Sequence, residues 1–301
     1  MNNLNLTPEN KKKLDEIMSK VGDLNFRRRV IKMLEYLDIQ PGDRILDMGC
    51  GEGFYSMIFD QLYECTVIAV DYDQEILDMA KKWLGDSTKV TFEIGDITNL
   101  RFEDNYFDKI VCTEVLEHIP DDVTSSRELY RVLKPGGVLA VTVPNKNYPF
   151  MWDPFNKVRE GLGLGHFNPL NGFWGGIWAY DHKRLYLPAD LKKLLTDADF
   201  QVTDLEVLTH YGVPFNHLVL YVGKNMYMKM PVPEEVKKSM EKFEWNQEES
   251  KEKVKKSLAG VLMKSLINIT FGIIKEVDKL NERKFPLDTS AMAVSARCIK
   301  K

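Results

Sequence analysis

The sequence of 301 residues is poor in cysteine and histidine and has no surplus of positive charge. No two of its four cysteines are close enough to form a CxxC metal or redox motif, which favours a reduced, cytoplasmic protein. Lys and Arg number 41 against 45 Asp and Glu, so the net charge is −4. Because this balance would not neutralise a phosphate backbone, general nucleic-acid binding is not expected.

The sequence also lacks an apolar run that predicts a signal peptide or a transmembrane helix. Its first residues, MNNLNLTPENKKK, are polar, and its most apolar stretch, Leu258 to Ile274, includes Lys264 and Asn268. Secretion and membrane spanning are therefore not expected. Hydrophobic residues at 44% and charged residues at 29% are typical of a globular protein with room for about two domains.

Between Arg44 and Val143, short β-branched runs alternate with helical patterns, which indicates a parallel sheet with helical crossovers. Strands are expected at Arg44–Met48, Val67–Val70, Val90–Ile94, Lys109–Thr113, Val138–Val143, Gln201–Val207 and Ala291–Ile299. Helices are expected within Pro8–Leu37, as one or two, and at Tyr55–Leu62, Gln74–Leu84, Val123–Leu133 and Pro188–Ala198, with a turn at Lys134–Gly137.

The strongest motif is a glycine loop, Gly49-Cys50-Gly51-Glu52-Gly53, between the first strand and the helix that follows it. Glycines at these positions let the backbone turn sharply and approach a ligand at the helix N-terminus. Their spacing differs from the GxGxxG of dinucleotide-binding proteins, and the preceding Asp47 would repel a pyrophosphate. A ligand with an ammonium or sulfonium group suits Asp47 better, which argues against a dehydrogenase.

Carboxylates also follow the second and third expected strands. Asp71, with Tyr72 next to it, comes 18 residues after Gly53, where a carboxylate can accept both hydroxyls of a ribose. Asp96 and Ile97 follow the third strand, where an adenine amine and ring face would lie. Successive strand ends therefore predict one nucleoside site at an edge of the sheet.

With these residues, and with Leu133-Lys134-Pro135-Gly136-Gly137 before a strand, residues 43–145 resemble the class I S-adenosylmethionine-dependent methyltransferases, particularly those related to ubiquinone and menaquinone biosynthesis; residues 182–207 match more weakly. The resemblance implies an α/β fold with a Rossmann-like, seven-stranded, mostly parallel sheet, an antiparallel last strand, helices on both faces and helical cap insertions. It implies S-adenosylmethionine as cofactor, bound by Asp47, Gly49, Gly51, Gly53, Asp71, Tyr72, Asp96, Ile97 and Glu114.

This interpretation divides the chain into six segments. An N-terminal helical segment (1–42) precedes the S-adenosylmethionine-binding core (43–144), and an aromatic substrate lid (145–187) follows. The core continues over 188–207, is interrupted by a mainly helical insertion (208–288), and ends with the final strand (289–301).

After the fourth strand comes Glu114-Val115-Leu116-Glu117-His118, beside the expected methyl donor. Offsets of three and four would place Glu114, Glu117 and His118 on one side of a helical turn. We interpret His118 and Glu117 as catalytic residues for acid–base chemistry, with a purely structural turn as the alternative. The pattern is also similar to the ExxEH metal motif of ubiquinone-pathway and small-RNA O-methyltransferases, which implies Mg²⁺ at these three residues; many relatives with a similar turn lack the metal.

Aromatic residues and glycines gather where the family carries its substrate lid. Three of the five tryptophans and six of the 19 glycines lie between residues 145 and 182. An aromatic wall there would enclose an apolar or cationic acceptor. The expected substrate residues are Trp152, Trp174, Trp178, Tyr180 and His182.

Two further segments leave alternatives open. The helical apolar face from Leu258 to Leu280 favours core packing, with a homodimer contact or peripheral membrane contact as alternatives. The run Phe26-Arg27-Arg28-Arg29 could meet the donor's carboxylate, but a solvated charge run is favoured.

The sequence therefore predicts methyl transfer to an oxygen, or a nitrogen, of a small organic acceptor. The alternatives are a non-catalytic nucleoside-binding or regulatory protein on the same fold and a methyltransferase that acts on a lipid or quinone carbon.

Overall fold

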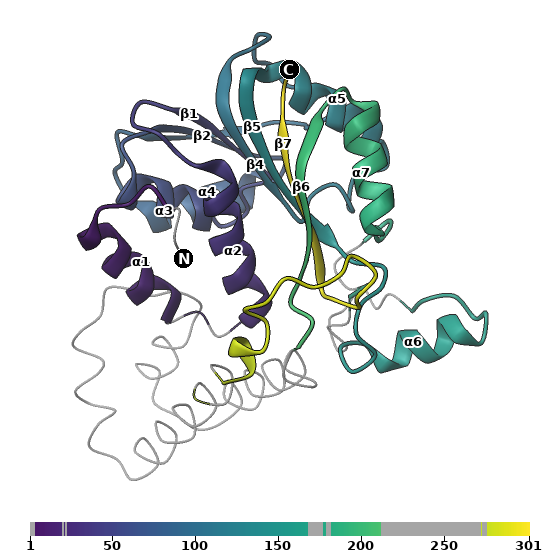
Figure 1. Ribbon diagram of the computed structural model, residues 1–301. Coiled ribbons are helices and arrows are strands. Elements are labelled where there is room, and N and C mark those ends of the chain that lie inside the picture. The colour runs from purple at the N-terminus through teal and green to yellow at the C-terminus, as the bar shows by residue number, and fades with distance from the viewer. Residues whose placement is uncertain are drawn as a thin grey trace. The chain divides into compact units, whose positions relative to one another are not determined.

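The computed structural model describes residues 4–19, 21, 23–167, 177–178, 182–211, 272 and 276–301 (Figure 1). Seven strands form one sheet in the order β3-β2-β1-β4-β5-β7-β6. They are β1 (Arg44–Met48), β2 (Thr66–Asp71), β3 (Val90–Ile94), β4 (Phe107–Thr113), β5 (Leu133–Pro144), β6 (Gln201–Leu208) and β7 (Ala293–Ile299). Only β7 runs antiparallel to its neighbours, so the predicted fold is confirmed.

Seven named helices accompany the sheet in the described residues: α1 (Pro8–Ser19), α2 (Leu24–Leu37), α3 (Phe54–Leu62), α4 (Gln74–Leu84), α5 (Asp122–Val132), α6 (Pro154–Gly161) and α7 (Pro188–Asp197). Aspartates begin several of them, because a carboxylate can accept the N–H groups left free in the first turn. Asp23, Asp73 and Asp121 do so at α2, α4 and α5.

The central strands β1, β4 and β5 are mainly apolar and buried because helices cover both faces of the sheet. Leu46, Ile110 and Val141 belong to a buried cluster that includes residues of α5 and α7. Since side chains alternate along a strand, their neighbours face the other way, where α2 contacts β4, β5 and β7. This arrangement leaves the strand ends as the place where polar side chains gather.

The predicted turn at Lys134–Gly137 is wrong as a boundary, because it lies inside β5. Phe107 pairs with Leu133 and Lys109 with Val138, so two steps along β4 face five along β5. Gly136 takes a φ of +76° in this irregular stretch. The Pro-Gly-Gly sequence forms a bulge within a strand that pairs on both sides of it.

The chain divides into two compact units. The first comprises residues 1–149, 181–210 and 283–301, and the second comprises 150–180 and 211–282. The sheet lies in the first unit and α6 in the second. Most of the predicted helix from Leu258 to Leu280, as well as Trp174 and Tyr180, lies outside the described residues.

Two expectations about the chain's surroundings can be compared with the structure. All four cysteines are among the described residues, and each is buried and free of a disulfide. In the part of the chain that the structure describes, no helix combines the length and the apolar character needed to cross a bilayer.

Candidate functional site

The sheet order creates a switch point between β1 and β4. These strands are neighbours, but the chain proceeds from β1 outward through β2 and β3 before it returns to β4 and β5. In open α/β sheets, ligands bind outside the carboxyl ends of the strands at such a point. The glycine loop follows β1, Asp71 ends β2 and Glu114 follows β4, so the predicted donor residues come to this edge.

The glycine loop is fixed by β2 and by the segment after β4. The N–H groups of Gly49 and Cys50 both donate to the Val70 carbonyl, at 2.7 and 3.0 Å. A Cβ on Gly49 would overlap the Val115 side chain, whereas one on Gly51 would meet no atom within 4 Å. Gly49 is therefore required by packing, and Gly51 borders open space where a ligand can approach.

Asp71 is held by the same loop. Its Oδ2 accepts the Gly51 N–H at 2.9 Å, and its Oδ1 accepts the Asp73 N–H at 3.1 Å. Each carboxylate oxygen retains a second lone pair, which suits two ribose hydroxyls. The carboxylate is thus oriented by backbone donors before any ligand arrives.

The predicted adenine residues lie at the end of the third strand. Asp96 Oδ1 accepts the N–H and the hydroxyl of Thr98, both at 2.8 Å, which fixes the carboxylate while Oδ2 stays available among the described contacts. Ile97 is buried, whereas Tyr72 beside Asp71 is 78% exposed. Tyr72 would therefore line a nucleoside pocket only with its exposed ring lying against the bound ligand.

Asp47 at the end of β1 is buried and receives a hydrogen bond of 2.6 Å from the Ser56 hydroxyl. Burial is the main cause that raises the pKa of Asp47 to about 7, because a buried carboxylate loses its hydration. Ser56 was not predicted to have a role. Its position in the first turn of α3, directly after the glycine loop that follows Asp47, is the signal that could have identified it.

Glu114 lies in a different setting from the one predicted. Its φ is +55°, and the turn of this segment covers only residues 116–118, so Glu114, Glu117 and His118 do not share a helical turn. Glu114 instead accepts the Thr142 hydroxyl at 3.1 Å and pairs with Arg29 of α2 at 2.7 Å. The prediction of a helical turn is wrong because these long-range contacts hold the backbone in a left-handed conformation.

Arg29, which the sequence predicts to lie in a solvated charge run, instead pairs with Glu114 at the end of β4. Its side chain is only 14% exposed. Helical spacing could have revealed this, since Phe26 and Met33 lie three residues before and four after Arg29, and Met33 is fully buried.

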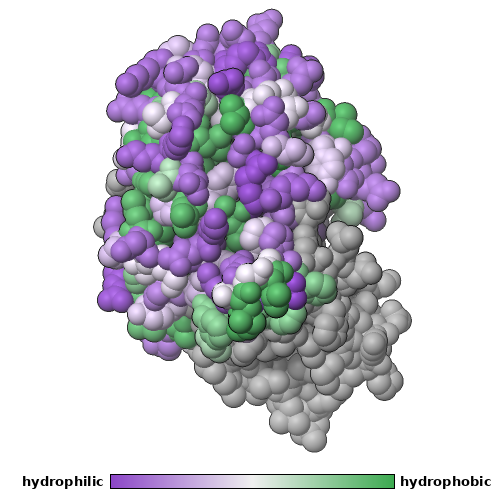
Figure 2. All heavy atoms as spheres, turned by 90° about the vertical axis from the view of Figure 1, so that its right-hand side faces the viewer, coloured by the Kyte–Doolittle hydropathy of each residue, from purple (hydrophilic) through white to green (hydrophobic). Residues whose placement is uncertain are grey.

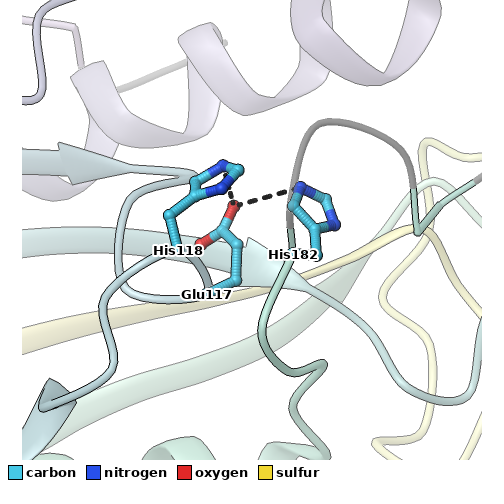
Figure 3. A group of neighbouring side chains, drawn as sticks. All are labelled: Glu117, His118 and His182. Carbon is cyan, nitrogen blue, oxygen red and sulfur yellow. Dashed lines mark ion pairs between the residues drawn. The ribbon is translucent and has the colours of Figure 1, made fainter. Parts of the chain in front are cut away.

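Glu117 is the centre of a second cluster (Figure 3). Its carboxylate is fully buried, and neither oxygen has a hydrogen-bond partner among the described residues. The Nε2 atoms of His118 and His182 both lie 3.9 Å from Oε1, and the two rings meet edge to face with centroids 4.7 Å apart. Burial first, and then the nearby Glu114 charge, hold the pKa of Glu117 well above its usual range.

Contacts between two distant segments create this cluster. The Lys183 N–H donates to the Glu117 carbonyl at 2.8 Å, and the Tyr186 hydroxyl donates to the Leu116 carbonyl at 3.2 Å. These bonds bring His182, predicted as a lid residue, beside the turn that carries His118. Its side chain is 12% exposed and that of His118 is 33% exposed, so His118 is the more accessible imidazole.

The cluster differs from the predicted metal set, because His182 takes the place of Glu114. One ligand atom from each of Glu117, His118 and His182 lies within 4.8 Å of the others. Mg²⁺ prefers oxygen ligands, whereas two imidazoles with one carboxylate are typical of transition metals. The donor set therefore fits Mg²⁺ poorly and a transition metal better.

Of the expected substrate residues, Trp152 and Trp178 belong to the second unit. The Trp178 indole N–H donates to Glu160 at 2.9 Å, and the His166 ring stacks on Trp178 with centroids 3.6 Å apart. Trp152 is half-buried. Because His166 covers one face of Trp178, the role of Trp178 as an acceptor wall stays a prediction, as does that of Trp152.

Comparisons with known proteins show similarity to methyltransferases. Residues 46–141 match the family model described as a methyltransferase domain. The chain is 33% identical over 129 residues to demethylmenaquinone methyltransferase of Staphylococcus saprophyticus, a match that covers 42% of this chain and 54% of that protein. It is 31% identical over 112 residues to phosphoethanolamine N-methyltransferase 3 of Arabidopsis thaliana, which covers 37% of this chain and 23% of that protein.

The chain thus spans about half or less of the length of these two relatives. Among solved structures, it is similar to the [4+2]-cyclase SpnF, with a TM-score of 0.54 and 18% identity, over 91% of this chain and 80% of that one. At this identity the likeness shows the fold alone. The family model, the sheet order and the glycine loop together identify residues 46–141 as a class I S-adenosylmethionine-dependent methyltransferase domain.

Proposed function

We propose that the protein binds S-adenosylmethionine at the carboxyl ends of β1, β2 and β3 and transfers its methyl group to a small organic acceptor. The observation that carries the proposal is the pre-oriented Asp71 carboxylate beside the open space at Gly51. Asp71 would accept the ribose hydroxyls, Asp96 the adenine amine, and Ile97 would contact the adenine ring. Gly49 and Gly53 would shape the loop, with Asp47 and Glu114 toward the methionyl part.

The acceptor proton would be handled by the Glu117–His118–His182 cluster. As an oxygen or nitrogen lone pair forms its bond to the methyl carbon, the carbon–sulfur bond breaks and its electron pair stays on sulfur. The proton of the acceptor passes to His118, the more accessible of the two imidazoles, and the buried Glu117 shares the resulting charge. In-line positioning and exclusion of water supply the rest of the rate acceleration.

The cluster favours an acceptor that must lose a proton during methylation, such as a hydroxyl or an amine. One of the relatives reported above is named as an N-methyltransferase of phosphoethanolamine, which supports a nitrogen acceptor, and another is named for demethylmenaquinone. An oxygen or nitrogen acceptor is our first proposal, and a quinone or lipid carbon is the alternative.

Calorimetry followed by transfer of a labelled methyl group tests this function. We expect S-adenosylmethionine and S-adenosylhomocysteine to bind, and we expect label to leave the donor with a hydroxyl or amine acceptor. Binding without transfer to any acceptor class would favour a non-catalytic nucleoside-binding or regulatory protein. Binding of a nicotinamide dinucleotide in place of both ligands would contradict the donor site.

A metal-assisted form of the same reaction is the second candidate, carried by the approach of two imidazoles to one buried carboxylate. Glu117, His118 and His182 would hold the ion, which would polarise the acceptor and lower its pKa. Two measurements distinguish the metal-assisted reaction from the metal-free one. They are the heat of binding when Zn²⁺, Mn²⁺ or Mg²⁺ is titrated into the protein, and the activity that remains after chelation. Binding of Mg²⁺ alone would contradict the preference that we infer from the donor set.

A further inference from the structure

Every charged side chain assigned above to the donor is acidic, yet S-adenosylmethionine carries a carboxylate of its own. Asp47, Asp71 and Glu114 would all repel that carboxylate at close range. A cation at the same edge of the sheet is therefore needed for tight binding of the amino-acid end. The structure offers Arg29 of α2.

Arg29 reaches the strand ends from the N-terminal segment. Its Nη1 lies 2.7 Å from Oε2 of Glu114, which directly follows β4. On the same helix the Phe26 ring lies edge to face with Phe54, with centroids 4.9 Å apart, and Phe54 begins the helix after the glycine loop. The first half of α2 thus contacts both sides of the switch point between β1 and β4.

These contacts leave part of the hydrogen-bonding capacity of the Arg29 guanidinium unsatisfied. Its Nε is buried and has no acceptor among the described residues. A buried N–H without a partner destabilises the protein, so a ligand that supplies an acceptor there relieves that cost on binding. A carboxylate is the ligand group that best matches the planar fork of a guanidinium.

The position also agrees with the direction of the donor. Asp71 at the end of β2 would hold the ribose, so the methionyl part extends past β1 toward β4, where Arg29 meets Glu114. We propose that Arg29 binds the carboxylate of the methionyl group and so selects donors with an intact amino-acid end. This inference rests on the proposed function of the same site.

The rest of α2 holds Arg29 in place before the ligand arrives. Lys32 pairs with Glu206 of β6 at 3.3 Å, and Arg297 of β7 donates to the Tyr36 carbonyl at 2.9 Å. The helix is therefore fixed to the sheet at its second half. Pre-organisation of this kind reduces the entropy lost on binding.

Calorimetry with two ligands tests the role of Arg29 in the full-length chain. S-Adenosylhomocysteine has the carboxylate, whereas 5′-methylthioadenosine keeps the adenosine and sulfur but lacks the amino-acid end. For Arg29→Gln we expect a loss of about 10- to 100-fold in affinity for S-adenosylhomocysteine and less than about 3-fold for methylthioadenosine. Arg29→Lys keeps the charge without the fork and should lose an intermediate amount.

Arg28→Gln, one residue away on the same helix, is the matched control and should change neither affinity. Equal losses for both ligands in Arg29→Gln would show that Arg29 only supports Glu114 and the fold, and would overturn the inference alone. Unchanged affinity for S-adenosylhomocysteine would overturn it as well. Failure of the unsubstituted chain to bind either ligand would overturn the donor assignment together with it.

Discussion

Two buried carboxylates at the same edge of the sheet are supported in opposite ways. Asp71, at the end of β2, has a backbone N–H donor on each oxygen. Glu117, after β4, has no hydrogen-bond donor on either oxygen among the described residues and faces two imidazoles at 3.9 Å. Backbone donors fix the direction in which the Asp71 carboxylate meets a ligand, whereas their absence at Glu117 favours a carboxyl group that exchanges a proton.

Figure 2 shows the contrast between polar and apolar surface on one face of the molecule, where hydrophilic and hydrophobic patches alternate over the described residues. The strand ends differ from that mixed surface, because Asp47, Asp71 and Glu117 are all at most 5% exposed. Charge buried to this extent needs a function or a partner. Asp47 and Asp71, which we assign to the donor site, accept hydrogen bonds from the protein. Glu117, which we assign to the acceptor site, lies beside the imidazoles of His118 and His182.

The largest expected effect is on the turnover rate, and it distinguishes the Glu117–His118–His182 cluster from the proposed donor residues around Asp71. His118→Ala should lower kcat by about 10²- to 10⁴-fold, because it removes the accessible base, and should leave donor affinity within about twofold. Single-turnover assays with calorimetry measure the two quantities. His210→Ala, which removes an imidazole that contacts the Ser290 carbonyl, is the control. A kcat unchanged by His118→Ala would leave proximity and desolvation as the source of catalysis.

The next effect concerns the loop that holds the donor side together. Gly49→Ala should destabilise the fold by about 2–4 kcal/mol, since the new Cβ overlaps Val115 and the φ of +70° is strained for alanine. Gly51→Ala has the strain without the overlap and should cost about 1 kcal/mol. Urea unfolding compares the two, and equal losses would show that the overlap is relieved by movement of Val115.

Donor affinity itself should respond to Asp71. Asp71→Ala should weaken binding of S-adenosylhomocysteine by about 1.5–3 kcal/mol through the loss of charged hydrogen bonds to the ribose. Asp73→Ala removes the N-cap of α4 two residues away, and should cost about 1 kcal/mol of stability with little change in affinity. Calorimetry on both variants decides whether the ribose role belongs to Asp71, and similar affinities would contradict it.

The strands β1, β2 and β3, and the positions of Asp47, Asp71 and Asp96 at or after their ends, could be predicted from the sequence, whereas the ligand roles of these residues stay predictions. The strands are apolar on both faces, and the carboxylates stand directly at their ends, so local pattern and spacing were enough. The bulge in β5 escaped prediction because Lys134-Pro135-Gly136-Gly137 has the composition of a turn. Only its pairing with β4 shows that the strand has already begun.

The surroundings of Glu114 and the Glu117–His118–His182 cluster were harder to predict from the sequence, because contacts between distant segments form them. Glu114 was expected in a helical turn, but Arg29 and Thr142, both far away in sequence, hold it at a positive φ. His182 was expected among the lid residues, and a backbone hydrogen bond from the Lys183 N–H to the Glu117 carbonyl places it beside the turn that carries His118. Neither contact has a local sequence signal.

The smallest expected effect tests whether Asp47 belongs with Asp71 or with Glu117. The pKa of Asp47 is raised to about 7 in the folded protein, whereas the pKa of an aspartate in the unfolded chain is about 4. Below the lower value the carboxyl is protonated in both states and its contribution to stability is fully present. As the pH rises toward 7, the unfolded chain releases the proton first, so this stability is lost. The unfolding free energy relative to Asp47→Asn, which cannot ionise, should therefore fall by about 1 kcal/mol between pH 5 and pH 6 and stay constant above pH 8. Urea unfolding of both proteins across this range measures the difference. A difference that does not vary with pH would mean that the Ser56 hydrogen bond keeps Asp47 ionised, and would group it with Asp71, whose carboxylate is also held by hydrogen-bond donors.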